Sequence, residues 1–197
     1  PDDLYWEVVE TPSEDLKGKD SYYSFHLPGK FDRIKGVTAI ILKDSPQDKN
    51  LPEMERRDGK NWIGLRIKNK GMVTDLYINQ LADGRLMHSN SWIEADGWTT
   101  DAYMFAVTYK EGTDPAASKD IFLSYGSALR RGSNTYFSSL SKLFYIQKEE
   151  DKGMKLWIEG QPKVNASFGQ MKRSGSLQVN GKQMPISYER GMLKVKY

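Results

Sequence analysis

The sequence predicts an all-β protein, an antiparallel β-sandwich, and two observations carry that prediction. The first is a series of short segments rich in β-branched and aromatic residues, such as 36–42, 61–68 and 101–109. The second is the regular return of turn dipeptides, above all Asp-Gly and Asn-Gly, which supply the positive φ angles of tight hairpin turns. Short strands joined by such turns are typical of sandwiches.

The predicted strands follow one another along the whole chain. They are 4–10, 21–27, 36–42, 61–68, 74–80, 101–109, 120–130, 143–147 and 154–160, with three brief strands after 175. The turn dipeptides are Asp58-Gly59, Asp83-Gly84, Asp96-Gly97, Lys152-Gly153, Asn180-Gly181 and Arg190-Gly191. The polar segment 43–60 predicts one long loop, and 138–144 is too short for a helix that is stable alone.

We expect one β-sandwich domain over 1–197, in which about 172–197 form either its last strands or a small terminal sheet. The chain begins at Pro1 without a methionine, so we also expect it to be excised from a longer chain. Alternation along the predicted strands gives the expected core. Its members are Ile40, Ile63, Leu65, Leu76, Ile78, Phe105, Val107, Leu123 and Trp157.

Composition narrows the classes of function. The 197 residues carry 29 basic and 26 acidic side chains, a net charge of +3 that is too small and too evenly spread to indicate nucleic-acid binding. There is no cysteine, and the two histidines, His26 and His88, share no metal-ligand spacing. Phosphate-binding and dinucleotide-binding glycine motifs are absent, as is an apolar run of membrane-spanning length. We therefore expect no metal, no cofactor and no membrane span.

The segment 88–103 is the strongest candidate for a binding site. It places two tryptophans, a tyrosine and a histidine around the Asp96-Gly97 turn. We expect Trp98 to pack inward and Trp92 to lie at a surface groove with His88 and Arg85. As an alternative, the whole stretch serves only to fold the chain.

Two further arginines end a predicted strand. Arg130 and Arg131 carry guanidinium groups that can fork onto a carboxylate or sulfate, although such a pair also suits an ordinary solvated loop. Tyr103, His88 and Arg85 are the candidates for catalysis, if the chain is an enzyme.

Several stretches resemble the C-terminal β-rich region of the heparinase II/III-like polysaccharide lyases. They are 23–42, 64–67, 74–109 and 122–132, together with the ending 179–197, "VNGKQMPISYERGMLKVKY". Members of that family join a helical toroid to stacked β-sheets and remove a proton α to a uronate carboxylate in the cleft between them. That chemistry needs a neutralising cation or amide, a base such as tyrosine or histidine, and an acid.

The resemblance has consequences for partners and location. The chain lacks the long amphipathic helices of the toroid, and neither His26 nor His88 matches the family's histidine motif, so no site residue is carried over. The resemblance implies an acidic polysaccharide or oligosaccharide as ligand, a helical catalytic half in the same parent chain, and a periplasmic or secreted location.

Three functional hypotheses remain open at this point. The chain is an incomplete, non-catalytic β-sandwich portion of a polysaccharide lyase, a free-standing carbohydrate-binding module, or a small complete lyase. In the second hypothesis Trp92 and Trp98, with Tyr103 as a further candidate, stack on sugar rings. The third hypothesis takes Tyr103 or His88 as base and Arg85 as the group that neutralises a uronate.

Overall fold

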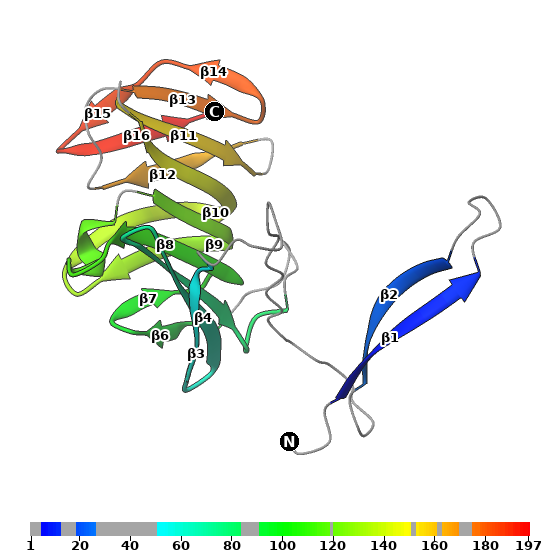
Figure 1. Ribbon diagram of the computed structural model, residues 1–197. Helices are drawn as coiled ribbons and strands as arrows, with labels where there is room; N and C mark the ends of the chain where they lie inside the picture. The colour runs from blue at the N-terminus through cyan, green and yellow to red at the C-terminus, as the bar shows by residue number, and fades with distance from the viewer. Residues whose placement is uncertain are drawn as a thin grey trace. The chain divides into compact units, whose positions relative to one another are not determined.

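The computed structural model describes residues 5–12, 19–26, 51–83, 91–118, 120–150, 153–160, 163–169 and 175–197. The chain divides into two compact units, 1–35 and 36–197. The first unit contains an antiparallel hairpin of β1 (Tyr5–Pro12) and β2 (Lys19–His26), in which Tyr5 lies opposite His26 (Figure 1). Both strands agree with the two strands that the sequence predicts there.

The second unit contains fourteen strands in its described part and one short 3₁₀ turn, η1 (Pro115–Ala117). The strands are β3 (Glu53–Gly59), β4 (Trp62–Asn69), β5 (Met72–Asn79), β6 (Ile93–Ala95), β7 (Trp98–Thr100), β8 (Met104–Lys110), β9 (Asp120–Arg131), β10 (Asn134–Glu150), β11 (Gly153–Glu159), β12 (Asn165–Phe168), β13 (Gly175–Val179), β14 (Lys182–Met184), β15 (Ser187–Glu189) and β16 (Met192–Lys196). The all-β prediction is confirmed. One pairing, β11 with β13, is parallel, so the sheet is mixed.

The long β9–β10 hairpin connects the other strands of this unit, because each of its two strands pairs with one neighbour at its start and with another at its end. The start of β9 pairs with β8 and the end of β10 with β11, whereas the end of β9 pairs with β7 and the start of β10 with β12. The ladder shifts register between Ser138 and Leu143, and Tyr125 has a positive φ of 52°. Such irregularities bend strands, and here they divide one continuous sheet into two layers.

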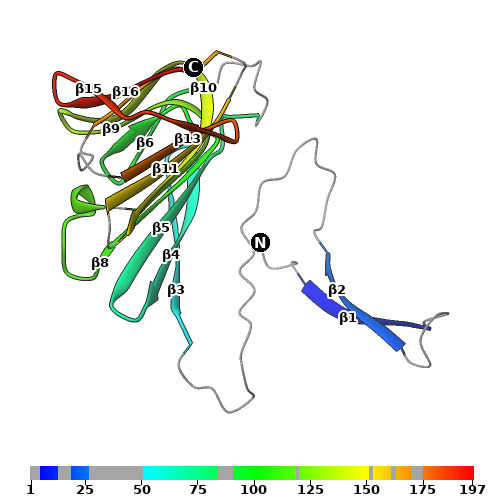
Figure 2. The same cartoon turned by 90° about the horizontal axis from the view of Figure 1, so that it is seen from above.

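We call these the first and the second layer. The first layer runs in the order β14-β13-β11-β10-β9-β8-β5-β4-β3, and the second joins β6 and β7 to the same hairpin and continues through β12, β16 and β15. In Figure 2, β3, β4, β5 and β8 lie in the lower part of the second unit, and β6, β15 and β16 lie in its upper part. The last strands are therefore hydrogen-bonded to the main sheet, β13 through β11 and β16 through β12.

Aromatic side chains fill the space between the layers. Trp98 of the second layer lies edge-on to Phe105 of the first, at 6.3 Å between ring centroids. Phe168 of the second layer lies 5.2 Å from Tyr145 of the first. All four side chains are almost completely removed from water. Apolar burial of this extent is the main stabilising contribution of the fold.

The core prediction is confirmed on part of the sheet and wrong on the rest. Four of the predicted residues are buried, namely Ile78, Phe105, Val107 and Leu123. Four are only half-buried, namely Ile63, Leu65, Leu76 and Trp157. Ile40 lies outside the described residues. On β4 and β11 the neighbouring positions Trp62 and Leu156 face the core instead, so these strands bury the face opposite to the predicted one.

The reason for this error is an apolar row on the outer face of the first layer. Ladder register places its members next to one another across six strands, in the order Leu65, Leu76, Ala106, Phe122, Ile146 and Trp157. All six are half-buried. A strand with apolar residues on both faces has no clear alternation, so its sequence does not reveal which face meets the core.

The segment 43–60 was predicted as a loop, and this is wrong for Glu53–Gly59, which form β3. This strand ends the sheet, and six of its seven residues are exposed while Arg57 is half-buried. An edge strand with charged side chains lacks the apolar alternation that marks an inner strand. Among the described strands, β3 has no partner on its other side, and charged side chains at such an edge oppose pairing with other chains.

Candidate ligand-binding site

The turn between β6 and β7 is the centre of the candidate site. Asp96 and Gly97 have φ angles of 48° and 81°, the two positive values that a tight hairpin turn between antiparallel strands requires. The predicted turn at Asp96-Gly97 is confirmed. The turn projects Trp98 into the core, where it is completely buried, while Trp92 is 49% exposed. The inward packing of Trp98 and the surface position of Trp92 are therefore confirmed, but stacking of Trp98 on a sugar ring is ruled out by its burial. The groove shared by Trp92 with His88 and Arg85 stays a prediction.

Arg131 holds this turn in place from the end of β9. Its guanidinium lies 5.2 Å from the centre of the Trp98 ring, and its Nη1 donates a hydrogen bond of 2.6 Å to the backbone oxygen of Asp96. Its Nη2 lies 3.4 Å from the carboxylate of Asp114. These three contacts tie the guanidinium to the turn and to Asp114, which gives Arg131 a structural role. Its contact with a ligand stays a prediction.

The carboxylate of Asp96 also has hydrogen-bond partners within the chain. Its Oδ2 accepts one hydrogen bond of 3.0 Å from Arg57 Nη2 and another of 2.9 Å from the hydroxyl of Tyr77. Burial, together with the charges of Asp75 and Asp96, raises the pKa of Tyr77 well above its ordinary value. Tyr77 is thus a neutral donor that fixes Asp96 and is not available as a base near neutral pH.

Trp92 and Arg130 form the exposed part of the site. The Arg130 guanidinium carbon lies 5.6 Å from the centre of the Trp92 ring, within cation–π range. Both side chains are exposed. Among the described residues no carboxylate lies within ion-pair distance of Arg130, in contrast to Arg57 and Arg131. We call this pair the Trp92–Arg130 platform.

The platform stands on the outward face of the second layer. Register places Arg130 between Thr99 of β7 and Thr135 of β10, and Thr99 lies opposite Glu94 of β6. The platform is thus flanked by hydroxyl groups, with one exposed carboxylate two strands away. Aromatic surface, a cation and hydroxyl groups are the chemistry that recognises a polar ring bearing an acid.

The remaining predicted site residues are less well placed by the structure. His88 and Arg85 lie outside the described residues. Tyr103 is half-buried between β7 and β8, where its backbone N–H donates to Ser124 and its carbonyl accepts from Asn79. Participation of these three residues in a site stays a prediction. Arg57, which the sequence analysis missed, reaches the site from a strand 39 positions before Asp96.

A second polar cluster lies on the inner face of the first layer. Arg66 makes a two-point contact with the buried carboxylate of Asp75, at 2.7 and 2.9 Å, and Tyr109 donates to the same carboxylate at 2.8 Å. The hydrogen bond to Asp75 raises the pKa of Arg66, whereas burial first and then Asp75 raise the pKa of Tyr109 to about 12. Every group is satisfied, which indicates a structural role.

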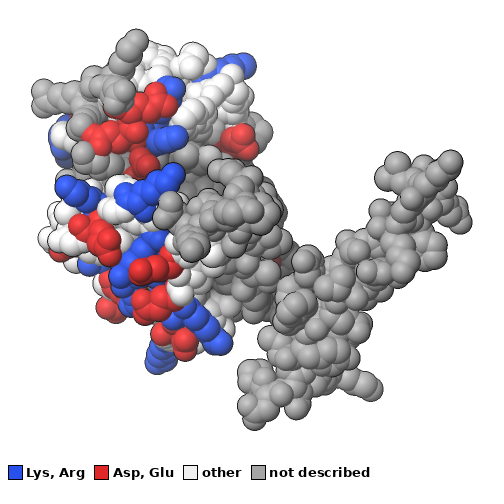
Figure 3. Space-filling model, in the orientation of Figure 1, with Lys and Arg blue, Asp and Glu red and all other residues white. Residues whose placement is uncertain are grey.

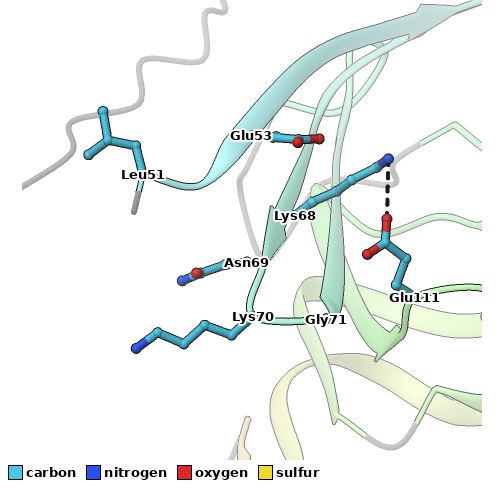
Figure 4. A pocket seen from close by; sticks show the side chains of 7 residues that line it. All are labelled: Leu51, Glu53, Lys68, Asn69, Lys70, Gly71 and Glu111. Carbon is cyan, nitrogen blue, oxygen red and sulfur yellow. Dashed lines mark ion pairs between the residues drawn. The ribbon is translucent and has the colours of Figure 1, made fainter. Parts of the chain in front are cut away.

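The pocket in Figure 4 lies at the far end of the β3–β4 ladder. It measures about 370 Å³ and is lined by Leu51, Glu53, Lys68, Asn69, Lys70, Gly71 and Glu111. Lys68 and Glu111 form an ion pair of 3.4 Å across it, and Lys70 points away from that pair. The pocket contains no aromatic ring and none of the predicted site residues. The platform is therefore the better candidate.

The charges of the described residues form no single-sign patch where they are visible on one face. On the face shown in Figure 3, basic and acidic side chains alternate over the surface. In the part of the chain that the structure describes, no three histidine, cysteine or acidic side chains are grouped as a metal site would require. No helix there is long and apolar enough to cross a membrane.

Comparison with known proteins assigns the chain to no family. No protein-family model matches the chain, and no curated protein is detectably similar to it. Function is therefore inferred from the residues and their geometry.

Proposed function

We propose that this chain is a non-catalytic β-sandwich portion of a polysaccharide lyase-like protein, and that it binds acidic, uronate-containing glycans. The Trp92–Arg130 platform carries the proposal. The exposed Trp92 ring offers a flat apolar surface to the C–H face of a sugar. Arg130, lying beside that ring without a carboxylate partner in the described part of the chain, offers two parallel donors to the sugar's acid group.

A binding role is better supported than a catalytic one. Elimination from a uronate needs a base whose pKa lies near the working pH. Burial raises the pKa of four described tyrosines, Tyr77, Tyr109, Tyr136 and Tyr145, so none of these four is suited to act as that base. In this proposal, the resemblance to heparinase II/III-like lyases places catalysis in a helical half of the same parent chain, in the periplasm or outside the cell.

Replacing Trp92 by alanine is expected to weaken binding of an acidic oligosaccharide about tenfold or more, because an exposed aromatic platform contributes on the order of 1–2 kcal/mol. Isothermal titration calorimetry with oligogalacturonate measures this. Arg130→Lys should also weaken binding, since an ammonium cannot make the two-point contact.

The matched control is Arg56→Lys, which makes the same change as Arg130→Lys at an exposed position on β3, where the ion-pair partner among the described residues is Asp58 at 3.6 Å. It should leave binding unchanged. Equal affinity of the wild-type chain for a neutral glucan of the same length would contradict the proposal, as would the absence of any binding.

The chain by itself should show no lyase activity. Elimination creates a conjugated double bond in the uronate product, so activity would appear as rising ultraviolet absorbance. We expect a flat trace on heparin-like, alginate-like and galacturonate substrates. A steady rise that Tyr103→Phe or His88→Ala abolishes would instead establish the chain as a small complete lyase.

A further inference from the structure

A second row of polar side chains crosses the outward face of the second layer. Ladder register places Ser138, Ser167, Lys194 and Ser187 next to one another on β10, β12, β16 and β15. Their chain neighbours Phe137, Phe168 and Leu193 are buried in the core. Because side chains alternate along a strand, the four polar side chains point outward.

Lys194 is the charged member of this row. Its Nζ lies 2.7 Å from the hydroxyl oxygen of Ser167. Within the described ranges no carboxylate lies within ion-pair distance of it, and its hydrogen-bond partner there is the Ser167 hydroxyl. An ammonium held by a neighbouring hydroxyl is oriented without being neutralised, and it retains donors for an anion.

A pocket of about 240 Å³ lies beside this row. Its polar lining is Lys194, Lys196, Ser187 and Glu189, and Met184 and Pro185 are among its apolar residues. Two ammonium groups, a hydroxyl and an acceptor carboxylate over an apolar floor suit a sugar ring that carries one negative charge and several hydroxyls.

The row and the Trp92–Arg130 platform share one face. Arg130 lies two residues from Ala128, which is paired with Ser138 at the start of the row. From β9 to β16 there are three strand steps of about 4.8 Å, and two residues along a strand add about 7 Å, so Arg130 and Lys194 lie roughly 16 Å apart. This separation is longer than a disaccharide.

We propose that Lys194, with Ser167, Ser187 and the adjoining pocket, is a second anion subsite, so that an acidic glycan lies extended across β9, β10, β12 and β16. The proposal rests on the function proposed above and deepens it. The chain then prefers the interior of a polymer to a short oligosaccharide, because only a long ligand reaches both subsites and gains from the second contact.

The experiment compares two ligands, a dimer and an octamer of galacturonate, by calorimetry on the full chain. Lys194→Ala should lower the affinity for the octamer about tenfold, the value of one charge-assisted hydrogen bond. It should change the affinity for the dimer less than about twofold. Lys194→Gln, which keeps most of the side-chain length, should behave in the same way.

The control is Lys148→Ala, an equal change of charge at an exposed position of β10 on the outer face of the first layer. It should affect neither ligand. If Lys194→Ala changes neither affinity, or both equally, while Trp92→Ala still weakens both, the second subsite is wrong and the proposed function stands. If the wild-type chain binds neither oligomer, both proposals fall.

Discussion

Replacing Trp98 by alanine is expected to lower the free energy of unfolding by about 3–5 kcal/mol, the usual loss for a large aromatic residue in a well-packed core. Trp98 is completely buried, 4.8 Å from the ring centre of Tyr136 and 6.3 Å from that of Phe105. It also supports the guanidinium of Arg131. Urea denaturation followed by circular dichroism measures the change.

The same hairpin region offers the matched control. Trp92→Ala removes an identical side chain that is 49% exposed, so its effect on stability should stay below about 1 kcal/mol. Trp98→Phe should cost less than Trp98→Ala, since Trp98 Nε1 has no hydrogen-bond partner among the described residues and only volume is lost. Equal destabilisation by Trp92→Ala and Trp98→Ala would contradict the assigned burial of the two rings.

Removing the carboxylate of Asp75 should produce the second large effect. Asp75→Ala leaves the Arg66 guanidinium without its two-point partner and the Tyr109 hydroxyl without its acceptor. We expect the free energy of unfolding to fall by about 3 kcal/mol, at the lower end for a buried ion pair, because the Arg66 side chain keeps 23% of its surface exposed and can rehydrate.

The double variant Arg66→Met with Asp75→Leu measures what the intact ion pair contributes to the free energy of unfolding. The single variant instead measures the loss caused by leaving one charge without its partner. Both charges leave together, so no charged group remains without a partner. Its stability should lie within about 1 kcal/mol of the wild-type value. If the double variant were as unstable as Asp75→Ala, the packing of these side chains, and not their ion pair, would account for the contribution of the cluster to stability.

Much of the local structure could be predicted from the sequence. Strand positions follow from β-branched and aromatic segments, and the turns at Asp96-Gly97, Asn180-Gly181 and Arg190-Gly191 have the positive φ angles that these residue types allow. One turn was misplaced by two residues: Lys60 and Asn61 form it, and Gly59 belongs to β3. Asn61, with a φ of 66°, supplies the left-handed conformation there.

The candidate site could be predicted only in part. The exposure of Trp92 and the burial of Trp98 could be predicted from their positions on either side of one turn. The pairing of Arg130 with Trp92, and of Arg57 with Asp96, could not be predicted, because it depends on which strands become neighbours. The outward row that contains Lys194 likewise exists only through the ladders between β10, β12, β16 and β15.

The sequence by itself determined the fold class, most strand positions and the hairpin turns, since these depend on the conformational preferences of neighbouring residues. The tertiary structure alone decided which face of β4 and β11 meets the core and which of the described cations have no carboxylate within ion-pair distance. Ile63 and Trp62 are equally apolar neighbours, and only the packing of the second layer over one face selects Trp62 for burial. Likewise, Arg130 and Arg131 are adjacent in the chain, but strand alternation turns Arg131 toward Trp98 and Asp96, whereas Arg130 remains outside beside Trp92.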